Sequence, residues 1–148
     1  MPYANGADML LRFGETELRQ LTDIGTPRTG SINYELLSQK LADASAWIDG
    51  YLVGRYPLPI TDAGALVILN MHCCNEARFM LMTNNADEAA VKAHEERTAF
   101  FMAIAKGTVS LLAPSAVPAA DGVGQVLFNP GSKVWGRESG ADGFGGAW

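Results

Sequence analysis

The sequence predicts an all-α protein: a small bundle of four to five helices followed by an extended, glycine-rich C-terminal tail. Apolar residues recur at steps of three and four through most of residues 1–106, as they do on one face of a helix. Residues that cap or end helices stand between these periodic stretches. After residue 106 the periodicity stops, and residues 107–148 hold nine of the sixteen glycines. We therefore predict a helical domain at 1–106 and an extended C-terminal arm at 107–148, which could include a short β-hairpin.

Two short helices are predicted near the N-terminus. Asn5 is a suitable cap for the first, because its side-chain oxygen can accept a hydrogen bond from an unpaired backbone N–H of the first turn. Gly14 can end that helix, since glycine tolerates the backbone conformations found just after a helix. Residues 15–21 form the second helix. The glycine, proline, threonine and serine content of residues 22–31 is typical of a loop.

A long helix is predicted from Ile32 to about Tyr56, with Ser31 as its N-cap. Its apolar stripe is formed by Leu37, Leu41, Ala44, Ile48, Tyr51 and Leu52. Pro57 and Pro59 then prevent further helix, because proline lacks a backbone N–H and restrains the residue before it.

The corner that ends this helix reads Gly-Arg-Tyr-Pro-Leu-Pro and is stiff and only weakly polar. Gly50 and Gly54 would each cost about 1 kcal/mol relative to alanine in a helix, so we expect them to permit the close approach of another backbone. Either the corner closes the core of its own subunit, or it holds the long helix at a fixed angle for a neighbouring subunit. The candidate residues for subunit packing are Gly50, Gly54, Arg55, Tyr56, Pro57 and Pro59.

Two further helices complete the predicted bundle. Asp62 can cap a fourth helix that runs to about Met82. This helix is apolar on nearly all sides, which is typical of a helix that is central or shared between subunits. Asn85 or Asp87 starts a fifth helix, which Gly107 ends.

The C-terminal arm combines flexible glycine with large aromatic residues. Residues 122–129 and 132–136 can form two short strands around an Asn-Pro-Gly turn. Aromatic side chains in such a segment either fold back on the body or anchor the arm in a partner's pocket, where tryptophan brings much rigid area at little entropic cost. The candidate partner-binding residues are Trp135, Arg137, Phe144 and Trp148.

Charge and hydropathy exclude several classes of protein. The net charge of −5 argues against tight binding of DNA phosphates, which requires clustered lysine and arginine. The longest apolar run covers residues 65–69, far short of the roughly 20 residues of a membrane span. The first residues lack the basic and apolar regions of a signal peptide. We expect a cytoplasmic protein that does not bind membranes.

No catalytic or metal-binding pattern is evident. His72, Cys73, Cys74 and Glu76 are adjacent in the sequence, but only His72 and Glu76 share a helical face, whereas zinc ligands must converge. Helical neighbours point about 100° apart, so the two cysteines are expected to be buried thiols rather than a disulfide. Motifs for nucleophilic catalysis and for nucleotide phosphates are missing. We therefore expect no enzymatic activity and no cofactor.

Two separated stretches resemble the head–tail connector family of Mu-like phages and prophages. They are YANGADMLLRFGETELRQLTD at 3–23 and LADASAWIDGYLVGRYPLPI at 41–60, which occur in the family's order. PGSKVWGRES at 130–139 is similar, more loosely, to a basic and aromatic segment near the family's C-terminus. Trp47 departs from the family pattern, in which a charged residue is usual at that position.

The resemblance implies a structural protein of the virion neck, assembled in the cytoplasm of the bacterial host. Such a connector forms a homo-oligomeric ring of about twelve copies, in which each subunit meets its neighbours through two different surfaces. The ring lies between the portal protein and the tail-side neck or tail completion protein, and it lines the channel through which double-stranded DNA passes without sequence-specific binding. The alternative is a helical interaction or regulatory module that forms dimers through its apolar fourth helix.

Overall fold

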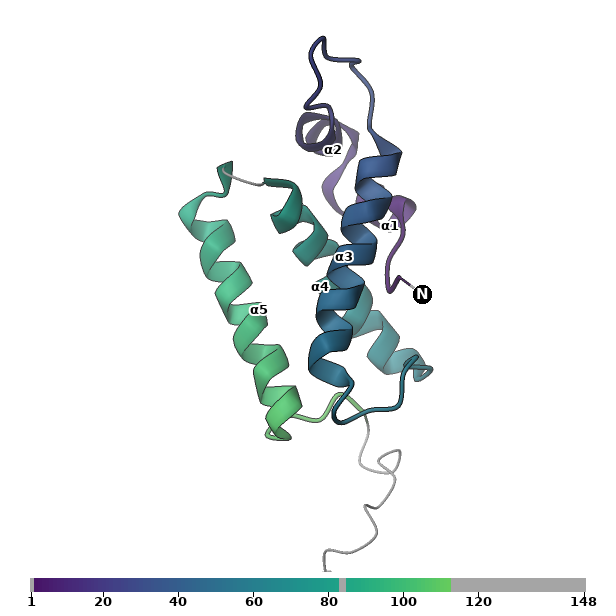
Figure 1. Ribbon diagram of the computed structural model, residues 1–148, viewed down its shortest axis with the longest axis vertical. Helices are drawn as coiled ribbons and strands as arrows, with labels where there is room; N and C mark the ends of the chain where they lie inside the picture. Colours follow the sequence, from purple (N-terminus) through teal and green to yellow (C-terminus); the bar gives the residue numbers. More distant parts are fainter. Residues whose placement is uncertain (1, 83–84, 113–148) are drawn as a thin grey trace, which may run out of the picture. The chain divides into compact units, whose positions relative to one another are not determined.

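The computed structural model describes residues 2–82 and 85–112, which form five α-helices and no strand (Figure 1). The helices are α1 (Gly6–Phe13), α2 (Glu15–Thr22), α3 (Tyr34–Leu52), α4 (Ala63–Met82) and α5 (Glu88–Lys106). The all-α prediction is confirmed. The hairpin suggested at 122–136 lies outside the described residues.

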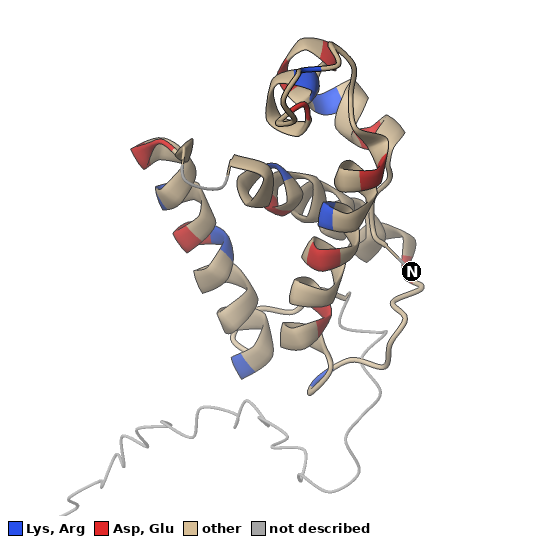
Figure 2. Ribbon diagram, turned by 45° about the horizontal axis from the view of Figure 1, so that its top comes forward, with Lys and Arg blue, Asp and Glu red and all other residues tan. Residues whose placement is uncertain are grey.

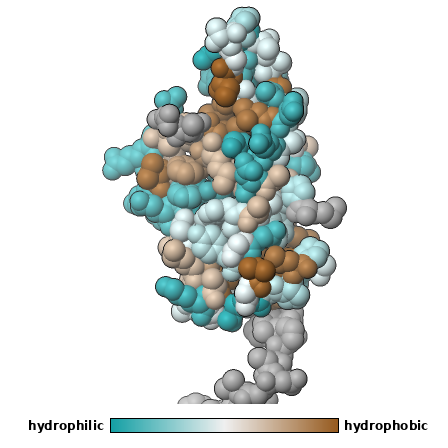
Figure 3. Space-filling view, in the orientation of Figure 1, coloured by the Kyte–Doolittle hydropathy of each residue, from teal (hydrophilic) through white to brown (hydrophobic). Residues whose placement is uncertain are grey.

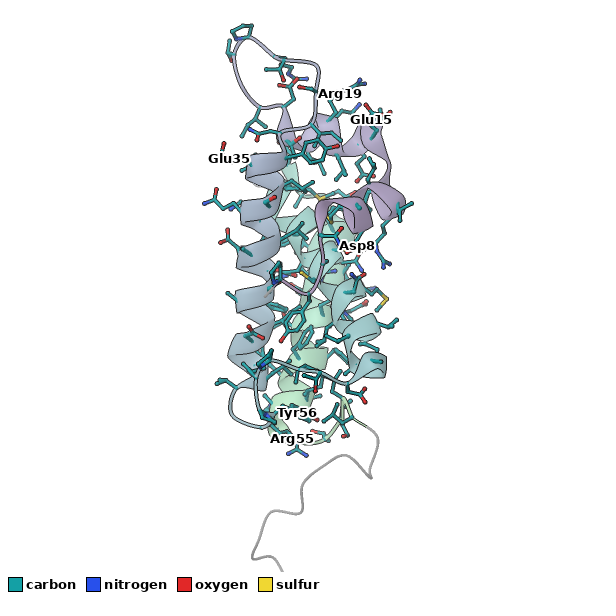
Figure 4. All side chains as sticks on the ribbon, turned by 90° about the vertical axis from the view of Figure 1, so that its right-hand side faces the viewer. Asp8, Glu15, Arg19, Glu35, Arg55 and Tyr56 are labelled. Atoms are coloured by element: carbon teal, nitrogen blue, oxygen red, sulfur yellow. The ribbon has the colours of Figure 1, made fainter. Side chains whose placement is uncertain are left out.

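The long helix α3 is the centre of the bundle and packs against α4 and α5. The short helices α1 and α2 also contact α3. In Figure 1, α4 passes behind α3 and α5 lies beside them. Figure 4 shows the same bundle turned by 90°, with α3 along one side and α4 beginning on the other.

Buried apolar side chains from all five helices form one core. The largest are Met9, Leu18, Leu37, Ile48, Leu52, Leu69, Phe101 and Ile104. Burying side chains of this size stabilises the fold by about 1.5–3 kcal/mol each. Leu111 also belongs to this core, so packing continues beyond the predicted domain boundary at 106/107. That boundary itself stays a prediction.

Side-chain caps fix most of the helix starts where the sequence indicates them. The side chain of Asn5 accepts a hydrogen bond from the Asp8 N–H, and Asp8 returns one to the Asn5 N–H. The carboxylate of Asp62 accepts from the Ala65 N–H at 2.8 Å. Asp87 caps α5 by accepting from the Ala90 N–H at 2.7 Å.

The predicted limits of the long helix were wrong at both ends. Asn33, not Ser31, is the N-cap, since its side-chain oxygen accepts from the Leu36 N–H at 3.1 Å. Ser31 instead lies 3.1 Å from the hydroxyl of Thr29 in the preceding loop. At the other end α3 stops at Leu52, whose carbonyl accepts hydrogen bonds from two turn residues ahead of the first proline.

A buried carboxylate joins α4 to α5. Glu76 is 1% exposed, and its Oε2 lies 3.1 Å from Nε of Arg97 and 3.0 Å from Nδ1 of His94. The His94 ring stacks on Phe79 with 4.3 Å between ring centroids. A charge so fully removed from water requires partners of this kind, and both are supplied by the facing helix. The arrangement holds the two helices in one register.

None of the helices formed by residues 2–82 and 85–112 has the length and apolar character needed to cross a membrane.

Candidate assembly surfaces

The corner after α3 closes the core of its own subunit. Tyr56 is buried, and its hydroxyl accepts a hydrogen bond from the Leu111 backbone N–H at 3.0 Å. Leu111 is itself buried, five residues from the end of α5 at Lys106. Figure 4 shows Tyr56 and Arg55 together at the end of the bundle where α3 stops. The first of the two interpretations of the corner therefore holds within the subunit.

Arg55 lies against the residue that ends α5. Gly107 has φ of 81°, and its N–H and that of Thr108 donate to carbonyls of the last helical turn, as in a Schellman motif. A Cβ placed on Gly107 would lie 2.2 Å from Nη1 of Arg55. Glycine is thus favoured here by the left-handed backbone, and an added methyl group would in addition displace the exposed Arg55 guanidinium.

Gly107→Ala should lower the free energy of unfolding by about 1–2 kcal/mol, because a left-handed backbone is unfavourable for alanine and the new methyl group must displace Arg55. Urea denaturation of the variant and the parent measures the difference. In an Arg55→Ala background the steric part disappears, so the same substitution should cost less. An equal cost in both backgrounds would show that Arg55 does not restrict this position.

The other corner residues are open to solvent. Gly50, Gly54, Pro57 and Pro59 are exposed, and a Cβ on either glycine would meet nothing within 4 Å. Among residues 2–82 and 85–112, no other backbone approaches these two glycines as closely as expected. Their use in contact with a neighbouring copy stays a prediction.

Small side chains form a stripe along the outer side of α3, which we call the α3 outer face. Ala42, Ala46, Gly50 and Val53 follow one another at steps of four, four and three, so they lie on one side of the helix. The first three are exposed, and Val53, at the end of the stripe, is 66% exposed. Of the four positions in this stripe, Val53 alone has a large side chain.

A second uncovered surface, which we call the α1–α4 face, is formed by Leu11 of α1 and by Leu66, Val67 and Met71 of α4. Leu11 is 88% exposed and Val67 is 72% exposed. An open groove of about 770 Å³ runs along this face, lined by the N-terminal residues, α1, the end of the corner and the first turns of α4. Exposed apolar area of this extent is typical of surfaces that bind another protein, a ligand or a membrane.

Charge is unevenly distributed over the bundle. Residues 63–75 of α4 contain no lysine, arginine, aspartate or glutamate. Charged residues instead occur along α2, α3 and α5 (Figure 2). On the side seen in Figure 3, apolar residues reach the surface in separate places among larger hydrophilic areas. The uncharged first half of α4 is therefore the part of the bundle best suited to an apolar contact.

The N-terminal segment connects α3 to α4 at the rim of this face. The Tyr3 N–H donates to Oγ of Ser45 at 3.0 Å, and its hydroxyl donates to the carboxylate of Asp49. Burial and the Asp49 carboxylate raise the pKa of Tyr3 above its ordinary value. Asn70 of α4 donates to the Tyr3 carbonyl at 3.2 Å and to Asp8 at 3.0 Å. One wall of the groove is thus held in place by hydrogen bonds.

The adjacent cysteines and histidine do not form a site. Both thiols are buried and free, and burial raises the pKa of Cys74 to about 11. His72 stacks on Phe100 with 4.9 Å between ring centroids. Within residues 2–82 and 85–112, no three side chains of metal-ligating type converge. These side chains serve packing between α4 and its neighbours.

Trp47, the departure from the family pattern, also has an internal role. Its ring packs edge-on against Tyr51 and Phe101, with centroids 4.9 Å and 5.4 Å away, and lies 5.9 Å from the ring of His94. It fills the space between α3 and α5 rather than presenting a separate surface.

The sequence pointed to some of these surfaces and missed others. Arg55 and Tyr56 are brought together with the end of α5, whereas Trp135, Arg137, Phe144 and Trp148 lie outside the described residues. Leu11 was not identified as a surface residue. The available signal was the run Met9-Leu10-Leu11, which has more consecutive apolar residues than one face of a short helix can bury.

The described residues thus form a five-helix bundle with two apolar faces that none of these residues covers. Residues 3–128 match the family described as Bacteriophage Mu, Gp36. The Mu-like prophage FluMu protein gp36 of Haemophilus influenzae is 31% identical over 137 residues, which cover 93% of this chain and 94% of the relative. Gene product J of Escherichia phage Mu is 40% identical over 90 residues, 60% of each protein.

The chain belongs to the Bacteriophage Mu Gp36 family. The predicted relation to proteins of Mu-like phages is confirmed at this level.

Proposed function

We propose that this protein is a structural, non-enzymatic head–tail connector, which forms a ring in the virion neck between the portal protein and the tail-side neck or tail completion protein. The observation that carries the proposal is the presence of two different apolar surfaces, the α1–α4 face and the α3 outer face, that no described residue of the bundle covers. A subunit with two unlike contact surfaces forms a ring when the angle between them closes. Membership of a phage protein family supports the setting.

The C-terminal arm is the proposed contact with the portal protein. Trp135, Arg137, Phe144 and Trp148 are its anchors, since aromatic and arginine side chains dominate the energetics of protein interfaces. Repeated around a ring, even weak anchors reinforce one another.

The proposed relation to DNA is passage without retention. A ring of subunits that each carry a net charge of −5 repels phosphate, which favours sliding of the duplex through its channel.

The purified protein should therefore show little binding to linear duplex DNA at physiological salt, and weak binding at low salt should disappear as salt is added. Fluorescence anisotropy with a labelled duplex measures this. Submicromolar binding with a steep salt dependence would contradict an acidic, non-adhesive channel.

The test of the proposed function is complementation of a phage deficient in the protein. Without it, filled heads and complete tails should accumulate unjoined in electron micrographs, and supplying the protein should restore joined particles. Mass spectrometry of purified virions should detect it. Infectious particles that form without the protein would overturn the proposal.

The second candidate function is a dimeric helical interaction or regulatory module, which the uncharged, apolar first half of α4 favours. Native mass spectrometry and virion composition separate the two: a stable dimer that does not occur in virions supports the module.

A further inference from the structure

We propose that, in the ring, the α1–α4 face of each copy packs against the α3 outer face of the next copy. This inference rests on the proposed function, because it names the two surfaces through which the connector subunits meet. It commits to a second copy of this chain as the occupant of the groove on the α1–α4 face.

The shapes of the two faces are complementary. The α1–α4 face presents large side chains, of which Leu11 and Val67 project furthest into solvent. The α3 outer face offers Ala42, Ala46 and Gly50, whose short side chains let another helix approach closely. Val53 is the one large apolar side chain of that stripe, and the apolar part of the groove, formed by Pro59, Ile60, Leu66 and Val67, can receive it.

The charges beside the two faces also match. Asp43 and Asp49 flank the α3 stripe on its two sides, because they lie one position after Ala42 and one before Gly50. Asp43 is exposed and carries only a surface ion pair with Lys40, which contributes little to stability. The α1–α4 face is bordered by the exposed Arg12 and by Asp8, whose carboxylate accepts from the Asn5 N–H and the Asn70 side chain. Asp49 likewise accepts from the Tyr3 hydroxyl, so Asp43 and Arg12 are the charges that can pair between copies. Opposite signs at the edges of two apolar surfaces favour one register over others.

The area is appropriate to a specific contact. Four large apolar side chains that are about 36% to 88% exposed give the α1–α4 face a patch of a few hundred Å², as large as the largest patch on a typical monomer. Together with its polar rim, such a patch can supply the roughly 800 Å² that one partner contributes to a standard interface.

The position of the faces permits a chain of contacts rather than a closed pair. The inner side of α3 packs against α4, and the stripe from Ala42 to Val53 lies on the other side of α3, so the stripe and the α1–α4 face are two distinct surfaces. A contact between two unlike surfaces of a subunit is heterologous, and its repetition generates a ring when the rotation from copy to copy closes.

The test is cross-linking in assembled particles that carry the full chain with Val53→Cys and Val67→Cys. A short bis-maleimide should convert the double variant into a ladder of multimers on a denaturing gel. Each single variant should remain monomeric, because a heterologous contact brings together one position of each kind. The parent protein, whose two cysteines are buried, is the background control.

Each result decides the inference. Monomer from the double variant, in particles shown to contain the protein, would overturn this pairing and leave the connector function standing. Dimer from Val67→Cys alone would mean that like faces meet, which also overturns it. Particles without the protein would overturn the connector function and this pairing together.

Substitutions that block each face give an independent readout. Ala46→Arg on one face and Val67→Asp on the other should each lower the yield of joined particles at least tenfold, with the thermal unfolding of the purified subunit unchanged. Gln20→Arg, on the exposed side of α2, is the matched control and should have no effect. Equal yields from all three variants would contradict the pairing.

Discussion

Replacing Arg97 with methionine should lower the free energy of unfolding by about 3–5 kcal/mol, because the substitution leaves a buried carboxylate without its permanently charged partner. Glu76 is 1% exposed, and its Oε2 lies 3.1 Å from Nε of Arg97. After the substitution His94 is the remaining partner of Glu76, and the His94 side chain is itself partly exposed to water. Urea denaturation followed by circular dichroism measures the loss.

The control for this prediction is a double variant in which the charge is removed from both helices. Glu76→Leu combined with Arg97→Met should recover most of the stability, since a buried ion pair replaced by apolar side chains of similar size is often neutral. A loss below about 1 kcal/mol for Arg97→Met alone would mean that water reaches Glu76 and that the seam between α4 and α5 is not sealed.

Ending the chain at Gly131 should abolish the joining of heads to tails while the helical domain still folds. The deletion removes Trp135, Arg137, Phe144 and Trp148, and truncation of one interfacial anchor typically costs about 2–4 kcal/mol. Because each 1.4 kcal/mol is about a factor of ten in affinity, loss of two anchors is sufficient to break the contact. Electron microscopy counts joined particles after complementation.

The controls for the truncation separate binding from folding. Thermal unfolding of the shortened protein should match that of the full chain, since the core ends at Leu111 among the described residues. Glu138→Ala in the full chain should leave the yield of joined particles unchanged, whereas Trp135→Ala should lower it. Normal yields of infectious particles from the shortened chain would show that the arm is dispensable.

The sequence predicted well those features that depend on neighbouring residues. The caps at Asn5, Asp62 and Asp87 and the end of α5 at Gly107 each follow from a side chain or a missing side chain acting on its own helix. The sequence analysis named Ser31 as the cap of the long helix, but Asn33, two residues further on, is also of a type that can cap a helix. Only the hydrogen bond of Ser31 with Thr29 in the folded loop decides between them.

Features that depend on residues far apart could not be predicted. The contact of Arg55 with Gly107 and the hydrogen bond from Leu111 to Tyr56 join segments about fifty residues apart, and no local pattern encodes them. The burial of Glu76 was missed for the same reason, since a single carboxylate in an apolar helix gives no sign that its partners lie on the next helix. The apolar excess of α4 was visible, but its division between core and surface required the packing of α1.

The most direct measurement of the connector function is a cryo-EM reconstruction of the neck of intact virions. The account predicts a closed ring between the portal and the tail, with each subunit fitted by the bundle of α1 to α5 and a C-terminal arm running from each subunit to the portal. A neck density that this bundle does not fit, or copies of the protein elsewhere in the particle, would contradict it.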